Sequence, residues 1–331
     1  AAPGNTGKNY SPGVLTQTRF YRRVVQSGLN DVCDDTSNVV ELTVIPRVSN
    51  NSITEDQTIC EAFAPAELSG SSPSGGDDTY SYQWEESKGS MAWDSITTVS
   101  SSTNYAPDTL HSDRYFHRIV RSGLNDACKD TSNHVLITVI PSIENNLISE
   151  DTVICSGQTT RPIAGNPPAG ATGTYIYSWE IKNEGDWQEA PNDNNSMNYQ
   201  PPVLNDTISL RRKVSSSVCN DFSNEVVITV LSNIANNTIP TDLMTCYRTS
   251  PGVIEGTEPA GGDVGNYTYT WIESLDQESW ENAEGTHGQK NYLAPVFIEK
   301  HYLKRIITSG LNECCKDTSN ILTLGIHPLP E

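Results

Sequence analysis

The chain has 331 residues and carries a net charge of −20 at pH 7. A strongly acidic chain is repelled by nucleic acid and by anionic membrane surfaces, so we expect neither as a partner. No run approaches the roughly 20 apolar residues of a transmembrane helix, which predicts no membrane span, and no signal peptide opens the sequence. Hydrophobic residues make up 35% of the chain, which predicts small domains whose thin cores benefit from covalent cross-links.

One stretch, Ser27–Asn38, recurs three times and organises the sequence. Its cysteine has counterparts at spacings of 95, 91 and 96 residues, and we call these four the loop cysteines: Cys33, Cys128, Cys219 and Cys315. Strand-like runs flank a turn-rich loop in each copy, which predicts a β-hairpin. The spacing suits independently folded domains and predicts a first segment (1–47), a second domain (48–141), a third domain (142–232) and a fourth domain (233–331).

The first segment has only the second half of this pattern. The motif that begins Asn9-Tyr10 near its start matches Asn104-Tyr105, which lies in the middle of the second domain. We therefore expect the first segment to be the C-terminal half of a domain, and the chain to be a piece of a longer protein.

Two strands are clearly patterned in each complete domain. Aromatic residues alternate along Tyr80–Trp84, so one face of that strand is expected to pack inward. The last strand alternates apolar and polar residues, as in Val135, Ile137 and Val139. Short strands, frequent turn signals and no helical period predict an all-β chain of tandem immunoglobulin-like β-sandwich domains in an extended rod.

A second group of cysteines stands near the start of each complete domain: Cys60, Cys155 and Cys246. If the first strand runs parallel to the last, each should begin at the end of the domain where its own loop cysteine lies. Geometry then predicts three bonds within domains, Cys60–Cys128, Cys155–Cys219 and Cys246–Cys315. Cys33 and Cys314 are left over. A zinc site would need clustered ligands, and only Cys314 and Cys315 are close in sequence, so disulfides and an extracellular location are favoured.

Nothing in the sequence predicts catalysis. The six histidines do not recur at equivalent positions, and none lies in a known catalytic motif. We expect no enzyme activity and no cofactor. Calcium is kept as the alternative because acidic residues recur near one end of each domain, although such residues are also common in capped turns. The candidate ligands are Asp56, Asp130, Asp151, Asp221, Asp242 and Asp317.

An arginine recurs in the strand that precedes each loop cysteine, on the same face as apolar residues. The four positions are Arg23, Arg118, Arg212 and Arg305. Two explanations are open: a buried carboxylate partner, or stacking on the second tryptophan of the domain (Trp93, Trp187 or Trp280), which we favour.

The spaced motifs Asn-Asn-x-Ile, Asp-x-x-x-Cys, Tyr-x-Tyr-x-Trp-Glu, Asn-Tyr-x-Pro and Cys-x-Asp-x-Ser-Asn run through the whole chain. This pattern resembles the tandem immunoglobulin-like repeats of large Bacteroidota surface adhesins, which are gliding-motility-associated and secreted by the type IX route. The resemblance implies a cell-surface location. It also implies O-glycans on Asp-Ser/Thr-apolar triplets, here at Ser95, Thr109, Thr152 and Thr207.

The near-identity of the domains favours a structural role, as a stalk or filament segment that presents a distal binding region or assembles into a fibre. Its partners would be neighbouring domains of the same longer chain and other copies in a fibre. The alternative is a module that binds a glycan or protein directly, through the variable loops 88–91, 183–185 and 274–277. A third hypothesis is that the chain is an accessory region of an exported enzyme.

Overall fold

The computed structural model describes residues 7–31, 33–89, 92–97 and 102–328. The chain forms two compact units, Ala1–Ser142 and Ile143–Glu331. Within the described ranges there is no α-helix; the helical elements include two short 3-10 turns, η2 (Leu124–Asp126) and η3 (Leu311–Glu313), and the regular structure is mainly strand. The all-β prediction is confirmed.

The first segment forms the predicted hairpin. Its strands pair antiparallel, β1 with β4 and β2 with β3, and their side chains are largely exposed. The strands are β1 (Arg19–Tyr21), β2 (Val24–Ser27), β3 (Cys33–Thr36) and β4 (Val40–Leu42).

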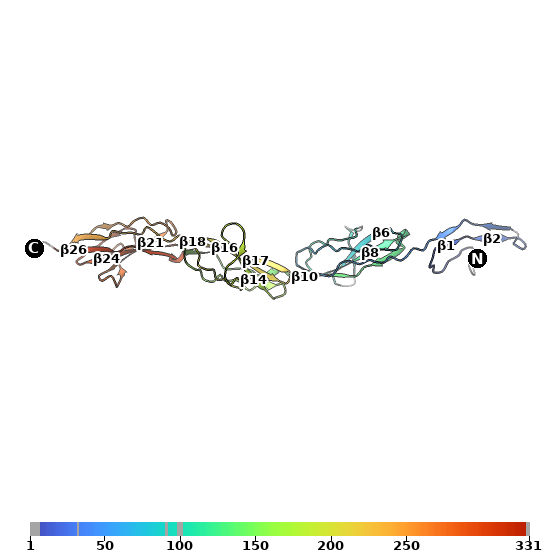
Figure 1. The fold of residues 1–331 in the computed structure, drawn as a ribbon, viewed down its shortest axis with the longest axis horizontal. Coiled ribbons are helices and arrows are strands. Elements are labelled where there is room, and N and C mark those ends of the chain that lie inside the picture. Colours follow the sequence, from blue (N-terminus) through green and yellow to red (C-terminus); the bar gives the residue numbers. More distant parts are fainter. Residues whose placement is uncertain (1–6, 32, 90–91, 98–101, 329–331) are drawn as a thin grey trace. The chain divides into compact units, whose positions relative to one another are not determined.

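The second domain is built on one six-stranded sheet in the order β5-β10-β8-β6-β7, with β9 paired to one end of β8. Figure 1 shows β6 and β8 side by side, which agrees with their antiparallel pairing. Isolated bridges such as Leu68–Tyr105 build the facing layer. The strands are β5 (Gln57–Cys60), β6 (Tyr80–Ser87), β7 (Asp94–Ser95), β8 (Arg114–Ser122), β9 (Cys128–Thr131) and β10 (Val135–Ile140).

The third and fourth domains repeat this topology, with the sheet orders β12-β18-β16-β14-β15 and β19-β26-β24-β21-β22. Their facing layers include the pairs β11–β13 and β20–β23. The strands of the third domain are β11 (Ile143–Glu144), β12 (Thr152–Cys155), β13 (Ala169–Gly170), β14 (Ile176–Lys182), β15 (Gln188–Glu189), β16 (Ile208–Ser216), β17 (Cys219–Phe222) and β18 (Val226–Leu231). The strands of the fourth domain are β19 (Asp242–Cys246), β20 (Val253–Ile254), β21 (Tyr267–Ser274), β22 (Glu281–Asn282), β23 (Tyr292–Leu293), β24 (His301–Ser309), β25 (Cys315–Thr318) and β26 (Leu322–His327).

Each core lies between the two layers and contains one fully buried tryptophan: Trp84, Trp179 or Trp271. Val135 and Ile137 of β10 are also fully buried, as their alternation predicts. The predicted packing of both strands is therefore confirmed, and the prediction of tandem immunoglobulin-like domains with it. The exact boundaries between domains stay a prediction.

The first strand of each complete domain runs parallel to the last, as expected. In register, Cys60 lies beside Ile140, Cys155 beside Leu231 and Cys246 beside His327. These cysteines, which we now call the strand cysteines, are each the last residue of their strand. They therefore lie where the chain leaves the domain.

Candidate functional site

The junction between the third and fourth domains is held by a disulfide. Cys155, at the end of β12, is bonded to Cys315, the first residue of β25, with their Cα atoms 5.5 Å apart. Both cysteines are 2% exposed. The bond joins two successive domains and does not close either one.

The three predicted pairings are therefore wrong. Cys155 is bonded to Cys315 and not to Cys219, while Cys128 and Cys246 are free thiols, so they are not bonded to Cys60 and Cys315. The prediction placed each strand cysteine at the start of its strand, but it is the last residue. Twelve residues of chain, about 40 Å at about 3.3 Å per residue, separate Cys219 from Leu231 beside Cys155.

An apolar contact accompanies the bond. Leu231, the last residue of β18, packs with Cys155, Ile307 and Cys315. A Cβ built on Gly310, whose φ is +82°, would lie 2.7 Å from Cys314 Sγ of the same domain and 2.9 Å from Leu231 Cδ1 of the other, so a larger residue would crowd the junction. We call Leu231 the junction residue and Gly310 the junction glycine.

Hydrogen bonds complete the junction. The Gly262 N–H donates to the Ser232 carbonyl at 2.8 Å, and the Gln158 side-chain amide donates to the Cys314 carbonyl at 3.2 Å. Both connect the third domain to the fourth. The junction is thus a packed interface and not a flexible linker.

The first segment and the second domain meet in the same way, without a bond. Ile45 is the junction residue, and a Cβ on the junction glycine Gly123 would lie 2.6 Å from its Cδ1. The Gly76 N–H donates to the Pro46 carbonyl at 2.9 Å. The thiol of Cys128 lies 3.6 Å from the same carbonyl oxygen.

A third sulfur lies beside the disulfide. The sulfur atoms of Cys155, Cys314 and Cys315 all lie within 4.8 Å of one another, and this is the only cluster of three metal-ligand side chains in the described ranges. Two of the three sulfurs are bonded to each other, so only the half-buried thiol of Cys314 remains. The cluster therefore does not supply three thiolate ligands for a metal. Cys60 and Cys219 are also disulfide-bonded, and Cys33 is a free, exposed thiol.

The domains match one family model four times. The model is described as "Domain of unknown function (DUF8696)", and it matches residues 1–46, 49–141, 144–232 and 235–328. The chain belongs to this family. Each match carries one loop cysteine.

Solved structures of tandem domains are similar to these DUF8696 domains at low sequence identity. Extracellular domains 3–5 of Drosophila OTK match with 10% identity over 86% of this chain and 100% of theirs, with a TM-score of 0.35. Consecutive domains of titin match with 11% identity over 86% and 99%, with a TM-score of 0.38. The FN1–FN3 domains of chicken CNTN1 match with 12% identity over 86% and 100%, with a TM-score of 0.33. Each of these TM-scores is below 0.5.

No match was found among curated proteins. Among the described residues of the DUF8696 domains, no helix is long and apolar enough to cross a membrane.

Each complete DUF8696 domain buries its recurrent arginine, but neither explanation from the sequence is correct. Arg118 is fully buried and donates from Nε to Asn51 Oδ1 at 3.0 Å, and from its two Nη atoms to the Thr103 and Ser71 carbonyls at 2.8 Å. A Cβ on Gly70 would overlap the guanidinium. Arg212 and Arg305 repeat this network with Asn146 and Asn237, whereas Arg23 in the first segment is exposed.

The second tryptophan instead covers the residue before the arginine. Arg211 lies 4.2 Å from the ring centre of Trp187, Lys304 lies 3.9 Å from that of Trp280, and the ring centres of His117 and Trp93 are 3.8 Å apart. Successive residues of a strand point to opposite faces, so the arginine one position later points into the core. The sequence signal that could have indicated the hydrogen-bond partner of the arginine is the second Asn of the Asn-Asn pair in each linker.

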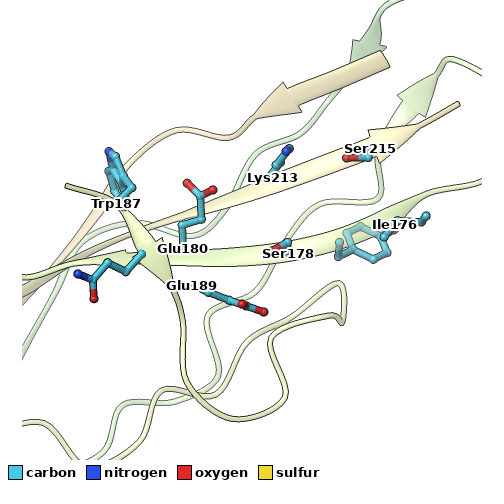
Figure 2. Close-up of a pocket in the computed structure, with 9 residues that line it drawn as sticks. Ile176, Ser178, Glu180, Trp187, Glu189, Lys213 and Ser215 are labelled. Carbon is cyan, nitrogen blue, oxygen red and sulfur yellow. The ribbon is translucent and has the colours of Figure 1, made fainter. Parts of the chain in front are cut away.

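The exposed face of the third DUF8696 domain carries a shallow hollow of about 350 Å³. Figure 2 shows Trp187, Glu180 and Lys213 along it. The Arg211 guanidinium donates to the Glu180 carboxylate at 2.7 Å, which holds both side chains beside the tryptophan.

The aspartates considered for calcium do not gather into a site among the described residues. Asp56 and Asp151 each accept a backbone N–H, from Leu136 and Val227, at 2.8 Å. Asp221 accepts the Asn146 amide at 3.0 Å. The bonds of Asp56 and Asp151 link the first strand of a domain to its last. Among the described residues no three of the six predicted ligands, which also include Asp130, Asp242 and Asp317, lie together.

The variable loops and glycosylation positions fall on the surface. In the loop 274–277, Asp276 accepts the N–H groups of Glu278 and Ser279 at 2.8 Å, and these bonds lower the pKa of its carboxyl. In the loop 88–91, Ser90 and Met91 lie outside the described residues. Among the predicted glycan acceptors three are exposed and Thr152 is half-buried, and their modification stays a prediction: Ser95, Thr109, Thr152 and Thr207.

Proposed function

We propose that the chain is a structural segment of the stalk or filament of an extracellular adhesin, in which successive domains are joined both by packing and by disulfides. The observation that carries this proposal is the Cys155–Cys315 bond, which links two domains end to end. A bond within one domain would stabilise that domain alone. A bond between domains stabilises the arrangement of the two domains, which suits a segment that bears a mechanical load.

The bond also limits how far the chain can stretch. Cys155 and Cys315 are 160 residues apart in sequence, and that intervening chain includes most of both domains. When the chain is pulled from its ends, the load crosses the bond, and the intervening residues cannot extend between these two points. A segment with this property keeps its length under a load that unfolds an unlinked domain.

The extracellular location is supported by the chemistry of the cysteines. Disulfides persist in oxidising compartments and are rare in the cytosol. The resemblance to Bacteroidota adhesins supports a place at the cell surface, export by the type IX route and the O-glycans at the surface triplets. We infer no enzyme activity and no cofactor.

Single-molecule stretching of the full chain tests the mechanical role. Each molecule is pulled from its two ends, before and after treatment with a thiol reductant. Reduction should lengthen the fully stretched chain by at least about 540 Å, because about 160 residues at about 3.4 Å each are released and the reductant also opens the bonds of Cys60 and Cys219. An equal stretched length in both states would contradict the proposal.

The second candidate is direct binding of a glycan through the hollow of Figure 2. Trp187 offers a flat apolar ring, and Glu180 and Lys213 offer polar groups beside it, a combination that suits a sugar. A glycan array hit that is lost in Trp187→Ala and kept in Trp93→Ala would favour this function over the structural one.

A further inference from the structure

One free thiol lies beside the disulfide that joins the third and fourth domains. The sulfur of Cys314 is within 4.8 Å of the sulfurs of both Cys155 and Cys315, which are bonded to each other. The Cys314 thiol points toward the Ser309 carbonyl at 3.9 Å, a distance that allows a weak contact. The sulfur of Cys314 therefore lies within reach of the bond and is held there weakly.

Packing does not explain why this residue is a cysteine. In the junction between the first segment and the second domain, Ala127 stands at the equivalent position, and Ile45 lies against Gly123 there as well. An alanine is thus sufficient for the same packing. The third domain has Val218 at this position, and among the four equivalent positions that of the fourth domain alone is a cysteine.

Exposure separates Cys314 from the two bonded cysteines. Cys155 and Cys315 are each 2% exposed, whereas Cys314 is half-buried. Thiol–disulfide exchange requires that the attacking sulfur reach the sulfur that it attacks. A small thiol in solution therefore has little access to the bond itself, but it has access to Cys314.

We infer that Cys314 is a site of S-thiolation, through which a small solvent thiol such as glutathione opens and closes the bond between the third and fourth domains. This inference rests on the proposed function and deepens it, because it assigns a means of control to the bond that carries that function. The junction glycine provides room for the site, since a Cβ on Gly310 would lie 2.7 Å from the Cys314 sulfur.

The first step is an exchange within the protein. The Cys314 thiol loses its proton, its thiolate attacks the sulfur of Cys155, a Cys155–Cys314 bond forms, and Cys315 leaves as a thiolate that takes up a proton. This step consumes no oxidant or reductant. Attack on Cys315 is disfavoured, because the Cα atoms of adjacent residues are about 3.8 Å apart and a disulfide usually spans about 4.4 to 6.8 Å.

The second step brings in the solvent thiol. Glutathione thiolate attacks the half-buried sulfur of Cys314, forms a mixed disulfide there, and releases Cys155 as a thiolate. This bond then no longer links the two domains. In the reverse reaction Cys155 attacks the mixed disulfide at Cys314, expels glutathione thiolate and restores the link. Each step breaks one disulfide and forms one, so the number of disulfides is constant.

The test incubates the folded full chain with reduced glutathione, traps free thiols with N-ethylmaleimide at intervals, and measures free Cys155 by peptide mass spectrometry. We expect free Cys155 to appear together with glutathione on Cys314. In Cys314→Ala the release of Cys155 should be at least about tenfold slower, because the reagent must then wait for local opening of the junction. Release of Cys219, a buried cysteine of another disulfide, should have the same rate in both proteins.

A second variant tests the exchange step by itself. Cys315→Ala, incubated with oxidised glutathione, should form a Cys155–Cys314 bond, and failure to form it would overturn the inference. Cys128→Ala is the matched control for Cys314→Ala, because it removes another half-buried free thiol. It should release Cys155 at the rate of the parent.

Release of Cys155 at the same rate in the parent and in Cys314→Ala would also overturn the inference, as would glutathione found first on Cys155 or Cys315. The peptide map of the untreated parent reports the proposed function separately. If that map contains the Cys155–Cys315 bond and Cys314→Ala reacts at the rate of the parent, the inference fails and the proposed function stands. If the untreated map lacks the bond, the proposed function itself fails.

Discussion

The two junctions, one in each unit of the chain, have the same packing and differ in one covalent bond. Ile45 contacts Gly123 in the first, and Leu231 contacts Gly310 in the second. Only the second has a disulfide across it, Cys155–Cys315, while Cys128 in the first is free. The comparison indicates that this packing forms with or without a disulfide, and that the bond adds a covalent link at the second junction.

The largest expected effect comes from removing the bond. Cys155→Ser combined with Cys315→Ser should lower the free energy of unfolding of the third and fourth domains by about 5 kcal/mol, the chain-entropy value for a loop of 160 residues. Hydrogen exchange read by peptide should show faster exchange there and unchanged exchange at the first junction.

Cys246→Ser is the matched control, because it removes a free thiol at the equivalent position of the fourth domain. It should leave exchange unchanged throughout the monomer. A double variant as stable as the parent would show that packing and not the bond holds the second junction.

A smaller effect is expected from the junction glycines. Gly123→Val and Gly310→Val each force a β-branched residue into positive φ and against a junction residue, at a cost of about 2 kcal/mol or more. We expect protease cleavage near Pro46 to rise sharply in Gly123→Val, since no bond holds that junction. Cleavage near Ser232 should rise less in Gly310→Val.

Gly28→Val provides the control for backbone strain alone, because its φ is also positive and its Cβ would meet nothing. It should leave cleavage at both junctions unchanged. Equal cleavage in the Gly123 and Gly310 variants would remove the difference that we assign to the bond.

The junction residues themselves should matter less, because both are only half-buried. Ile45→Ala and Leu231→Ala should each cost about 1 kcal/mol of stability, measured by urea unfolding. The exposed Val14 gives a matched control, and Val14→Ala should change nothing. A larger loss for Leu231→Ala than for removal of the bond would reverse the order proposed here.

The smallest effect is a pH dependence confined to the second domain. Its residue under the second tryptophan is His117, where the other domains have Arg211 and Lys304, and burial lowers the pKa of His117 below its usual 6.5. The unfolded chain then binds this proton more readily than the folded one, so stability is complete above pH 6.5 and falls as the pH decreases below it.

Thermal melting from pH 8 to pH 5 checks this prediction, with His117→Asn as the comparison. The variant should have a weaker pH dependence than the parent between pH 6.5 and pH 5. Identical slopes in the two proteins would mean that another group is responsible.

The fold was largely predictable from the sequence, and the junction was not. The alternating residues of Tyr80–Trp84 and of the last strand identify the buried faces, because a strand has a period of two residues. The period also places Arg118 on the inward face of its strand, but it does not identify the group that the guanidinium binds. The predicted partner of Arg118 was therefore wrong. The asparagine partner Asn51 is distant in sequence, and only the folded domain brings it to the guanidinium.

The disulfide error has a different cause. Strand boundaries are the least certain part of a sequence-based prediction, and here the position of Cys155 within its strand decides the partner. The prediction needs Cys155 at the end of its strand that lies nearer its own loop cysteine, whereas it is the last residue and is bonded to the next domain. No local pattern distinguishes the two, whereas the parallel register with Leu231 does.

Non-reducing peptide mapping of the full chain tests the central claim most directly. We predict a cross-linked pair of peptides that contains Cys155 and Cys315, from two successive domains. A peptide pair that joins Cys155 to Cys219 within the third domain would contradict the account, because the domains would then be closed separately and not linked to each other.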